Sequence, residues 1–153
     1  MAKTDKVPMF VRAGNVLTLT LLRAGVKLVG PGVVFGNYPM YLLTVRGRKS
    51  GLPRTVPIAI IERNGKRYVG SPYGIVDWVR NLRAAGEAIL TRGRRAETVN
   101  AIELPAREAA LVLREEIKGG NPFARYFGVT ADSSREEFER AAVTHPVFVL
   151  ERK

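Results

Sequence analysis

One segment of the chain reads Tyr41-Leu-Leu-Thr-Val-Arg-Gly-Arg-Lys-Ser-Gly-Leu-Pro-Arg-Thr-Val-Pro57. Its apolar start, residues 41–45, contains the β-branched and aromatic side chains that suit a half-buried pleated surface, which predicts a strand. Residues 46–51, called the basic turn below, hold three cations and a hydroxyl around two glycines. A second strand is predicted over residues 55–61. The segment therefore predicts two strands joined by a glycine-flanked, positively charged turn.

The basic turn has the chemistry of a phosphate-binding site. Glycines at its ends let backbone N–H groups face a ligand without obstruction by Cβ, and such nests of donors bind anions. Arginine adds a planar fork that matches phosphate, and lysine adds a point charge. The turn is not a Walker loop, because Arg48 stands where that motif needs glycine, and Pro53 and Pro57 oppose the helix that should follow. The alternative is a solvated hairpin turn that happens to be basic.

The rest of the chain alternates predicted strands with a few helices. Strands are predicted near residues 55–62 and 66–72, joined by an Asn64-Gly65 hairpin turn, and near residues 87–92, 95–104 and 146–151. Helices are predicted over residues 75–85, over 105–118, and after Ser134, where Glu137 completes a capping box. Hairpin-linked strands with inserted helices predict an α+β protein built on an antiparallel β-barrel.

Composition limits the chemistry. The chain has 153 residues and no cysteine, so we expect one domain, no disulfides and no thiol catalysis. A single histidine, His145, leaves no ordinary zinc or haem ligand set, and we expect it to be structural. The formal net charge of +11 fits nucleic acid, an anionic membrane or an acidic small molecule as partner. No nucleic-acid reader module is recognisable, so we expect no nucleic-acid partner.

A family resemblance extends this interpretation. The pattern Gly47-Arg48-Lys49-Ser50-Gly51-x-Pro53-Arg54, then Pro57, then Trp78-x-x-Asn81-Leu82, resembles the deazaflavin-dependent nitroreductases, also called deazaflavin (coenzyme F420)-dependent quinone reductases. The resemblance covers residues 38–104 well. It implies a split β-barrel of the FMN-binding type that is commonly paired into homodimers. It also implies hydride transfer from reduced coenzyme F420, an 8-hydroxy-5-deazaflavin, to a quinone, enone or nitroaromatic acceptor.

The resemblance also implies a set of site residues. The cofactor-binding residues would be Arg48, Lys49, Ser50, Gly51, Arg54, Pro57, Ile58, Ala59, Ser71, Pro72, Tyr73, Gly74, Trp78 and Asn81. The aromatic residues Phe123, Tyr126 and Phe127 would bind the acceptor. No catalytic side chain and no metal are expected, because a bound deazaflavin carries the hydride chemistry itself. Each residue also has a structural alternative, with Trp78 in the core and Asn81 bonded to local backbone.

The beginning of the chain forms a separate segment. Residues 1–36 predict an amphipathic helical segment, followed by the split-barrel domain over residues 37–153. Charges interrupt every apolar run there, so we expect no membrane span and no cleaved signal peptide. We expect a cytoplasmic protein whose helix packs on the domain or contacts the anionic inner face of the cell membrane. Two functional alternatives stay open, an FMN-binding oxidoreductase on the same barrel and a non-catalytic lipid- or cofactor-binding barrel.

Overall fold

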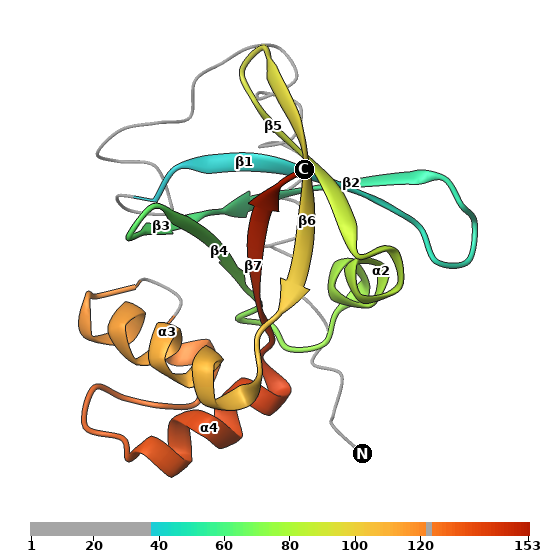
Figure 1. Ribbon diagram of the computed structural model, residues 1–153. Coiled ribbons are helices and arrows are strands. Elements are labelled where there is room, and N and C mark those ends of the chain that lie inside the picture. Colours follow the sequence, from blue (N-terminus) through green and yellow to red (C-terminus); the bar gives the residue numbers. More distant parts are fainter. Residues whose placement is uncertain (1–37, 122–123) are drawn as a thin grey trace.

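The structure is a computed structural model that describes residues 38–121 and 124–153 (Figure 1). The predicted N-terminal helix and the predicted acceptor residue Phe123 lie outside the described residues. The fold is therefore described for the barrel and its helices.

Among the described residues, seven strands form one antiparallel sheet, which confirms the predicted antiparallel arrangement and adds one strand to the six predicted. The strands are β1 Met40–Arg46, β2 Pro53–Ala59, β3 Ile61–Arg63, β4 Lys66–Gly70, β5 Glu87–Arg92, β6 Arg95–Glu103 and β7 Val147–Arg152. Their order across the sheet is β2-β1-β5-β6-β7-β4-β3. The two edge strands, β2 and β3, are neighbours in the chain, with Ile60 alone between them. The sheet therefore curls until its two edges belong to one continuous segment (Figure 1).

The predicted single strand over residues 55–62 is thus two strands. Ile60 is fully buried, and its N–H donates to the carbonyl oxygen of Pro39 at 3.0 Å. The chain bends at this residue because β2 pairs with β1 while β3 pairs with β4. The next turn follows the prediction, since Asn64 and Gly65 both have positive φ angles, 50° and 73°.

Within residues 38–121 and 124–153, three α-helices and one short 3₁₀ helix accompany the sheet. They are α2 Asp77–Ala85, α3 Ala106–Lys118, η1 Ala124–Phe127 and α4 Arg135–Thr144. Helices α3 and α4 lie together at one end of the sheet, whereas α2 lies apart from them against β1, β5 and β6 (Figure 1). The predicted capping box of α4 is present, with Ser134 Oγ accepting from the Glu137 N–H at 3.2 Å.

Two apolar clusters correspond to these two groups of elements. The first fills the curled sheet and includes the inward faces of β1, β5 and β7 together with Val76, Val79 and Leu82 of the α2 segment. The second joins α3, η1 and α4, with Phe138 at 1% exposure. Alternate residues of the strands face the first cluster. Residues 48–51, in the turn between β1 and β2, lie at the surface.

Candidate functional site

The basic turn is a compact loop closed by its own backbone. The Gly47 N–H donates to the Leu52 carbonyl oxygen, and the Gly51 N–H donates to the Gly47 carbonyl oxygen, both at 2.8 Å. Gly51 has a φ of +70°, which glycine adopts without strain. A Cβ on Gly47 would lie 2.8 Å from Ser50 Oγ, so a side chain there would force the turn apart. The two glycines are therefore required by the shape of the turn.

Arg48 fastens the basic turn to α2. Its backbone N–H and its Nη1 both donate to Asn81 Oδ1, at 3.1 Å and 2.8 Å. Its Nη2 donates to Asp77 Oδ1 at 3.2 Å. Asn81 and Asp77 are four residues apart on α2, so their side chains share one face of the helix. Asn81 is 5% exposed and lies against the basic turn, and its place in the cofactor site stays a prediction.

Lys49 and Arg54 are exposed cations of this region, as is Arg46 at the end of β1. Within residues 38–121 and 124–153, neither forms an ion pair with a carboxylate. Arg54 is close to the turn, because a Cβ built on Gly47 would lie 3.5 Å from Arg54 Cγ. Ser50 is bonded inside the turn, where its Oγ accepts from the Leu52 N–H at 3.2 Å. Lys49 within the turn and Arg54 beside it therefore carry positive charges that no carboxylate among the described residues pairs with.

The predicted β2 residues divide between the two faces of the strand. Ile58 is 8% exposed and belongs to the barrel core. Pro57 and Ala59 are half-buried and, by the alternation of a strand, lie on the opposite face. Any contact of Ile58 with a ligand would have to come from its backbone, whereas Pro57 and Ala59 can offer side-chain surface.

The segment from Ser71 to Gly74 connects β4 to α2 and is tied down by internal bonds. Ser71 is 1% exposed, its N–H donates to the Pro146 carbonyl oxygen, and its Oγ donates to the Gly74 carbonyl oxygen. The Gly74 N–H donates to the Ser71 carbonyl oxygen at 3.2 Å. Gly74 also packs closely, since an added Cβ would lie 3.2 Å from the Thr144 carbonyl oxygen. Ser71 and Gly74 therefore shape this loop, and their N–H groups are already bonded within the protein.

Trp78 packs on the barrel core. Its ring centroid lies 6.3 Å from that of Phe148, which is 1% exposed and belongs to the first apolar cluster. Trp78 is itself only partly buried. The core contact that sequence reasoning offered as an alternative is present, and the exposed part of the ring remains for the predicted site.

One predicted acceptor residue, Tyr126, contacts the loop before α2. Tyr126 of η1 contacts Tyr73 edge-on, with ring centroids 4.9 Å apart. Burial, followed by the influence of Tyr126, raises the pKa of Tyr73. Phe127 is 5% exposed and packs against the His145 ring, with centroids 5.4 Å apart. Tyr73 and Tyr126 thus form an aromatic pair beside the start of α2, while Phe127 and His145 are largely structural.

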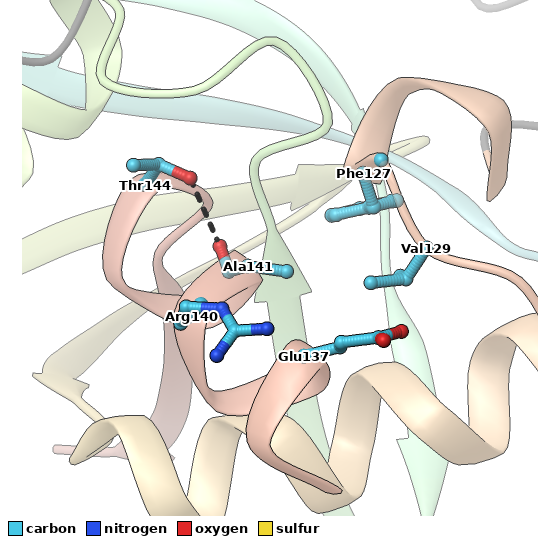
Figure 2. A pocket seen from close by; sticks show the side chains of 7 residues that line it. Phe127, Val129, Glu137, Arg140, Ala141 and Thr144 are labelled. Atoms are coloured by element: carbon cyan, nitrogen blue, oxygen red, sulfur yellow. Dashed lines mark hydrogen bonds between the residues drawn. The ribbon is translucent and has the colours of Figure 1, made fainter. Parts of the chain in front are cut away.

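A separate pocket lies between η1 and α4 (Figure 2). It is lined by Phe127, Gly128, Val129, Glu137, Arg140, Ala141 and Thr144. Figure 2 shows Phe127 and Val129 on one side, and Glu137 and Arg140 of α4 on the other. Among the described residues, Phe127 is the one predicted site residue that lines it. The predicted cofactor residues lie outside this pocket, in the basic turn, β2, the loop over residues 71–74 and α2.

Sequence reasoning missed Asp77. It lies in the first turn of α2 and contacts Arg48 and, at 3.8 Å, Arg80. The available signal was its spacing of four residues from Asn81, which places both side chains over the same helical surface.

No helix among the described residues is long and apolar enough to span a bilayer.

The chain is similar to several known proteins. Residues 23–151 match the family described as F420H(2)-dependent quinone reductase. A structure named F420-H2 dependent reductase (FDR-A) is 26% identical, with a TM-score of 0.54 over 74% of this chain and 94% of that one. A structure described as a domain-swapped dimer is also 26% identical, with a TM-score of 0.55 over 93% of this chain and 97% of that one. A protein of unknown function from Agrobacterium tumefaciens, 14% identical, shares the fold with a TM-score of 0.52, over 99% of this chain and 58% of that one. No curated protein matches.

These findings confirm the split-barrel fold, the cofactor class and the oxidoreductase activity that the resemblance implied. The protein is an F420-dependent reductase. By its match over residues 23–151, the chain belongs to the F420H2-dependent quinone reductase family.

Proposed function

We propose that the protein transfers a hydride from reduced coenzyme F420 to an electron-poor quinone, enone or nitroaromatic. The observation that carries the site assignment is the basic turn, which Arg48 bonds to α2 and which carries Lys49, with Arg54 of β2 beside it. Neither Lys49 nor Arg54 pairs with a carboxylate among the described residues. The coenzyme carries a phosphodiester and a polyglutamate tail, both anionic. Charge-assisted hydrogen bonds from a rigid cationic loop suit such groups.

Different residues of the site would bind different parts of the coenzyme. Lys49, Arg54 and the backbone N–H groups of residues 49–50 would bind the phosphate and tail, because the N–H groups of Arg48 and Gly51 already donate to Asn81 and Gly47. Pro57, Ala59 and the exposed part of Trp78 would line the ring, with the backbone of Ile58 beside it. The loop over residues 71–74 would support the ring edge. When bound in its reduced form, the coenzyme supplies the hydride, so the protein needs only to bind, orient and exclude water.

The acceptor would bind at the aromatic pair. Tyr73 lies four residues before Asp77, the first residue of α2, and Tyr126 packs against it. The anion-binding turn contacts the same helix through Asp77 and Asn81. The cofactor and acceptor contacts therefore converge on residues 73–81. Aromatic side chains favour flat, electron-poor rings, which supports quinones and nitroaromatics as acceptors.

Binding and turnover test the proposal separately. Coenzyme F420 and FMN are each titrated into the pure protein while ligand fluorescence is followed. We expect F420 to bind more tightly, and tighter FMN binding would favour the flavin alternative. Oxidation of reduced F420 is then followed with menadione, cyclohexenone and a nitroaromatic. Binding without turnover of any acceptor would favour the non-catalytic binding barrel.

Two partner predictions accompany this function. One similar structure is a domain-swapped dimer, which supports a homodimer here, and light scattering would measure it. Contact with anionic membrane depends on residues 1–36, outside the described residues. Salt-sensitive binding to anionic vesicles that is lost on deleting residues 1–29 would support it, and equal binding by the truncated protein would contradict it.

A further inference from the structure

We propose that Arg48 and Asn81 form a latch that fixes the basic turn against α2, so that Arg48 positions the anion site instead of binding the phosphate. The inference rests on the proposed function, because it names how that site is held. It changes the role of one predicted cofactor residue. It also explains why an asparagine of α2 belongs to a site whose charges lie on a turn far away in the chain.

The first argument is geometric. Two N–H donors of Arg48 converge on the Asn81 Oδ1 atom, at 3.1 Å from the backbone and 2.8 Å from Nη1. Two donors on one atom also identify that atom as the amide oxygen. Asn81 is 5% exposed, so an unmade bond there would not be replaced readily by water. The turn is thereby held at both the main chain and the side chain of one residue.

The second argument concerns which donors remain for a ligand. Both terminal nitrogens of Arg48 already donate to α2, Nη1 to Asn81 and Nη2 to Asp77. A bidentate phosphate contact through these two nitrogens would compete with the bonds that hold the turn. Lys49, one residue later, forms no ion pair within the described parts of the chain. The direct contacts to the anion are therefore assigned to Lys49, Arg54 and the turn backbone.

The third argument is electrostatic. The buried partner of Arg48 is a neutral amide, and its carboxylate partner, Asp77, has a side chain that is 82% exposed. Solvent screens the charge of an exposed carboxylate strongly. The latch thus fixes the guanidinium without cancelling its charge. Arg48 adds positive potential to the turn while both of its terminal nitrogens are bonded to α2.

The ligand-free protein provides the first test, by amide hydrogen exchange at Arg48. We expect the Arg48 N–H to be protected in the wild type, exposed in Asn81→Ala and protected again in Asn81→Asp, which keeps the acceptor oxygen. Arg83→Lys is the matched control, because Arg83 also lies on α2 but pairs with Glu103 of β6. Unchanged protection in Asn81→Ala would overturn the latch, whether or not the protein binds F420.

Coenzyme affinity provides the second test. Arg48→Lys keeps the charge but loses the guanidinium geometry, and we expect it and Asn81→Ala each to weaken F420 binding about tenfold. The double variant should lose no more than Asn81→Ala alone, because both changes open the same latch. If the two losses of F420 affinity instead multiply to about a hundredfold in the double variant, Arg48 binds the phosphate independently of Asn81. That result would overturn the proposal.

Asn81→Asp then separates positioning from direct contact. At low salt its added negative charge should weaken F420 binding. At ~1 M salt, where the Debye length is about 3 Å, that penalty is screened and Asn81→Asp should bind more tightly than Asn81→Ala. If Asn81 instead donated to the phosphate, Asn81→Asp would bind more weakly than Asn81→Ala at both salt concentrations, which would contradict the latch. Failure of the wild type to bind F420 at all would refute the proposed function, and the exchange experiment would still decide the latch.

Discussion

Two arginines join helices to the barrel, and the partners they use differ in charge. Arg48 reaches α2 through the neutral amide of Asn81. Arg63, at the end of β3, reaches α3 through two carboxylates, contacting Glu115 and, at 3.3 Å, Glu116. The Glu116 side chain is 4% exposed and that of Glu115 is 59% exposed. Beyond Asn81, Arg48 meets the exposed carboxylate of Asp77, at 3.2 Å, whereas Arg63 meets a buried carboxylate, that of Glu116.

The difference has a functional meaning. The buried carboxylate of Glu116 needs a cation beside it, since an unpaired charge in the interior costs free energy, and Arg63 supplies that cation. An arginine beside an anion site serves better if its charge remains available. Burial and then the hydrogen bond to Glu116 raise the pKa of Tyr38, so the acidic cluster also holds the segment before β1. We therefore assign a structural role to the α3 contact, whereas the α2 contact belongs to the proposed site.

The largest expected effect comes from breaking the structural contact. Glu116→Ala leaves Arg63 without its buried partner, and we expect a loss of about 3 kcal/mol in the free energy of unfolding. Urea denaturation measures it. Glu115→Gln, which alters the exposed partner, should cost less than about 0.5 kcal/mol. Equal losses in the two variants would show that burial does not distinguish these carboxylates.

The second prediction concerns the site charges. Lys49→Ala should weaken F420 binding by roughly 1.5–3 kcal/mol, or about tenfold to a hundredfold, because a charge-assisted contact is lost. Its free energy of unfolding should stay unchanged, since no carboxylate within the described residues pairs with Lys49. Fluorescence titration at two salt concentrations measures the affinity. An unchanged salt dependence in Lys49→Ala would contradict a direct ionic contact.

The third prediction concerns an ion pair whose carboxylate, Glu97, is 25% exposed, between the exposures of Glu116 and Glu115. Arg67 of β4 donates to Glu97 of β6 and lowers the pKa of Glu97 below its ordinary value of 4.5. A depressed folded-state pKa stabilises the fold above the ordinary value, and the gain disappears as the pH falls through the folded-state pKa. We expect Glu97→Gln to lower the free energy of unfolding by about 0.5–1 kcal/mol at pH 7 and to leave it unchanged below the folded-state pKa of Glu97. Urea denaturation at pH 7 and well below pH 4 checks this, and a difference that grows on acidification would refute it.

The smallest effect is expected at the exposed partner of Arg48. Asp77→Asn removes a carboxylate whose side chain is 82% exposed, so the free energy of unfolding should change by less than about 0.5 kcal/mol. Affinity for F420 should be kept or slightly raised, because a negative charge near the turn is gone. Weaker F420 binding in Asp77→Asn would mean that the carboxylate, and not Asn81, holds Arg48 in place.

Much of this architecture could be predicted from local sequence. The Asn64-Gly65 turn and the Ser134 capping box need only their own residues, because each is a short-range hydrogen-bonding arrangement. The basic turn was likewise visible as glycines around cations. The break at Ile60 was not predictable, because nothing in its local sequence distinguishes a bent strand from a straight one. It follows from pairing with two different strands.

The sequence by itself determined the chemistry of this protein: an antiparallel barrel, a cationic turn, aromatic residues near a helix, and through its family the F420 coenzyme. Only the tertiary structure decided how those groups are used. It brought Asn81 within hydrogen-bond distance of Arg48, which lies 33 positions earlier in the chain. It also packed Trp78 on Phe148 and bonded Ser71 within its own loop. The physical reason is that residue type fixes which bonds a group can make, whereas long-range packing fixes which partner comes within reach.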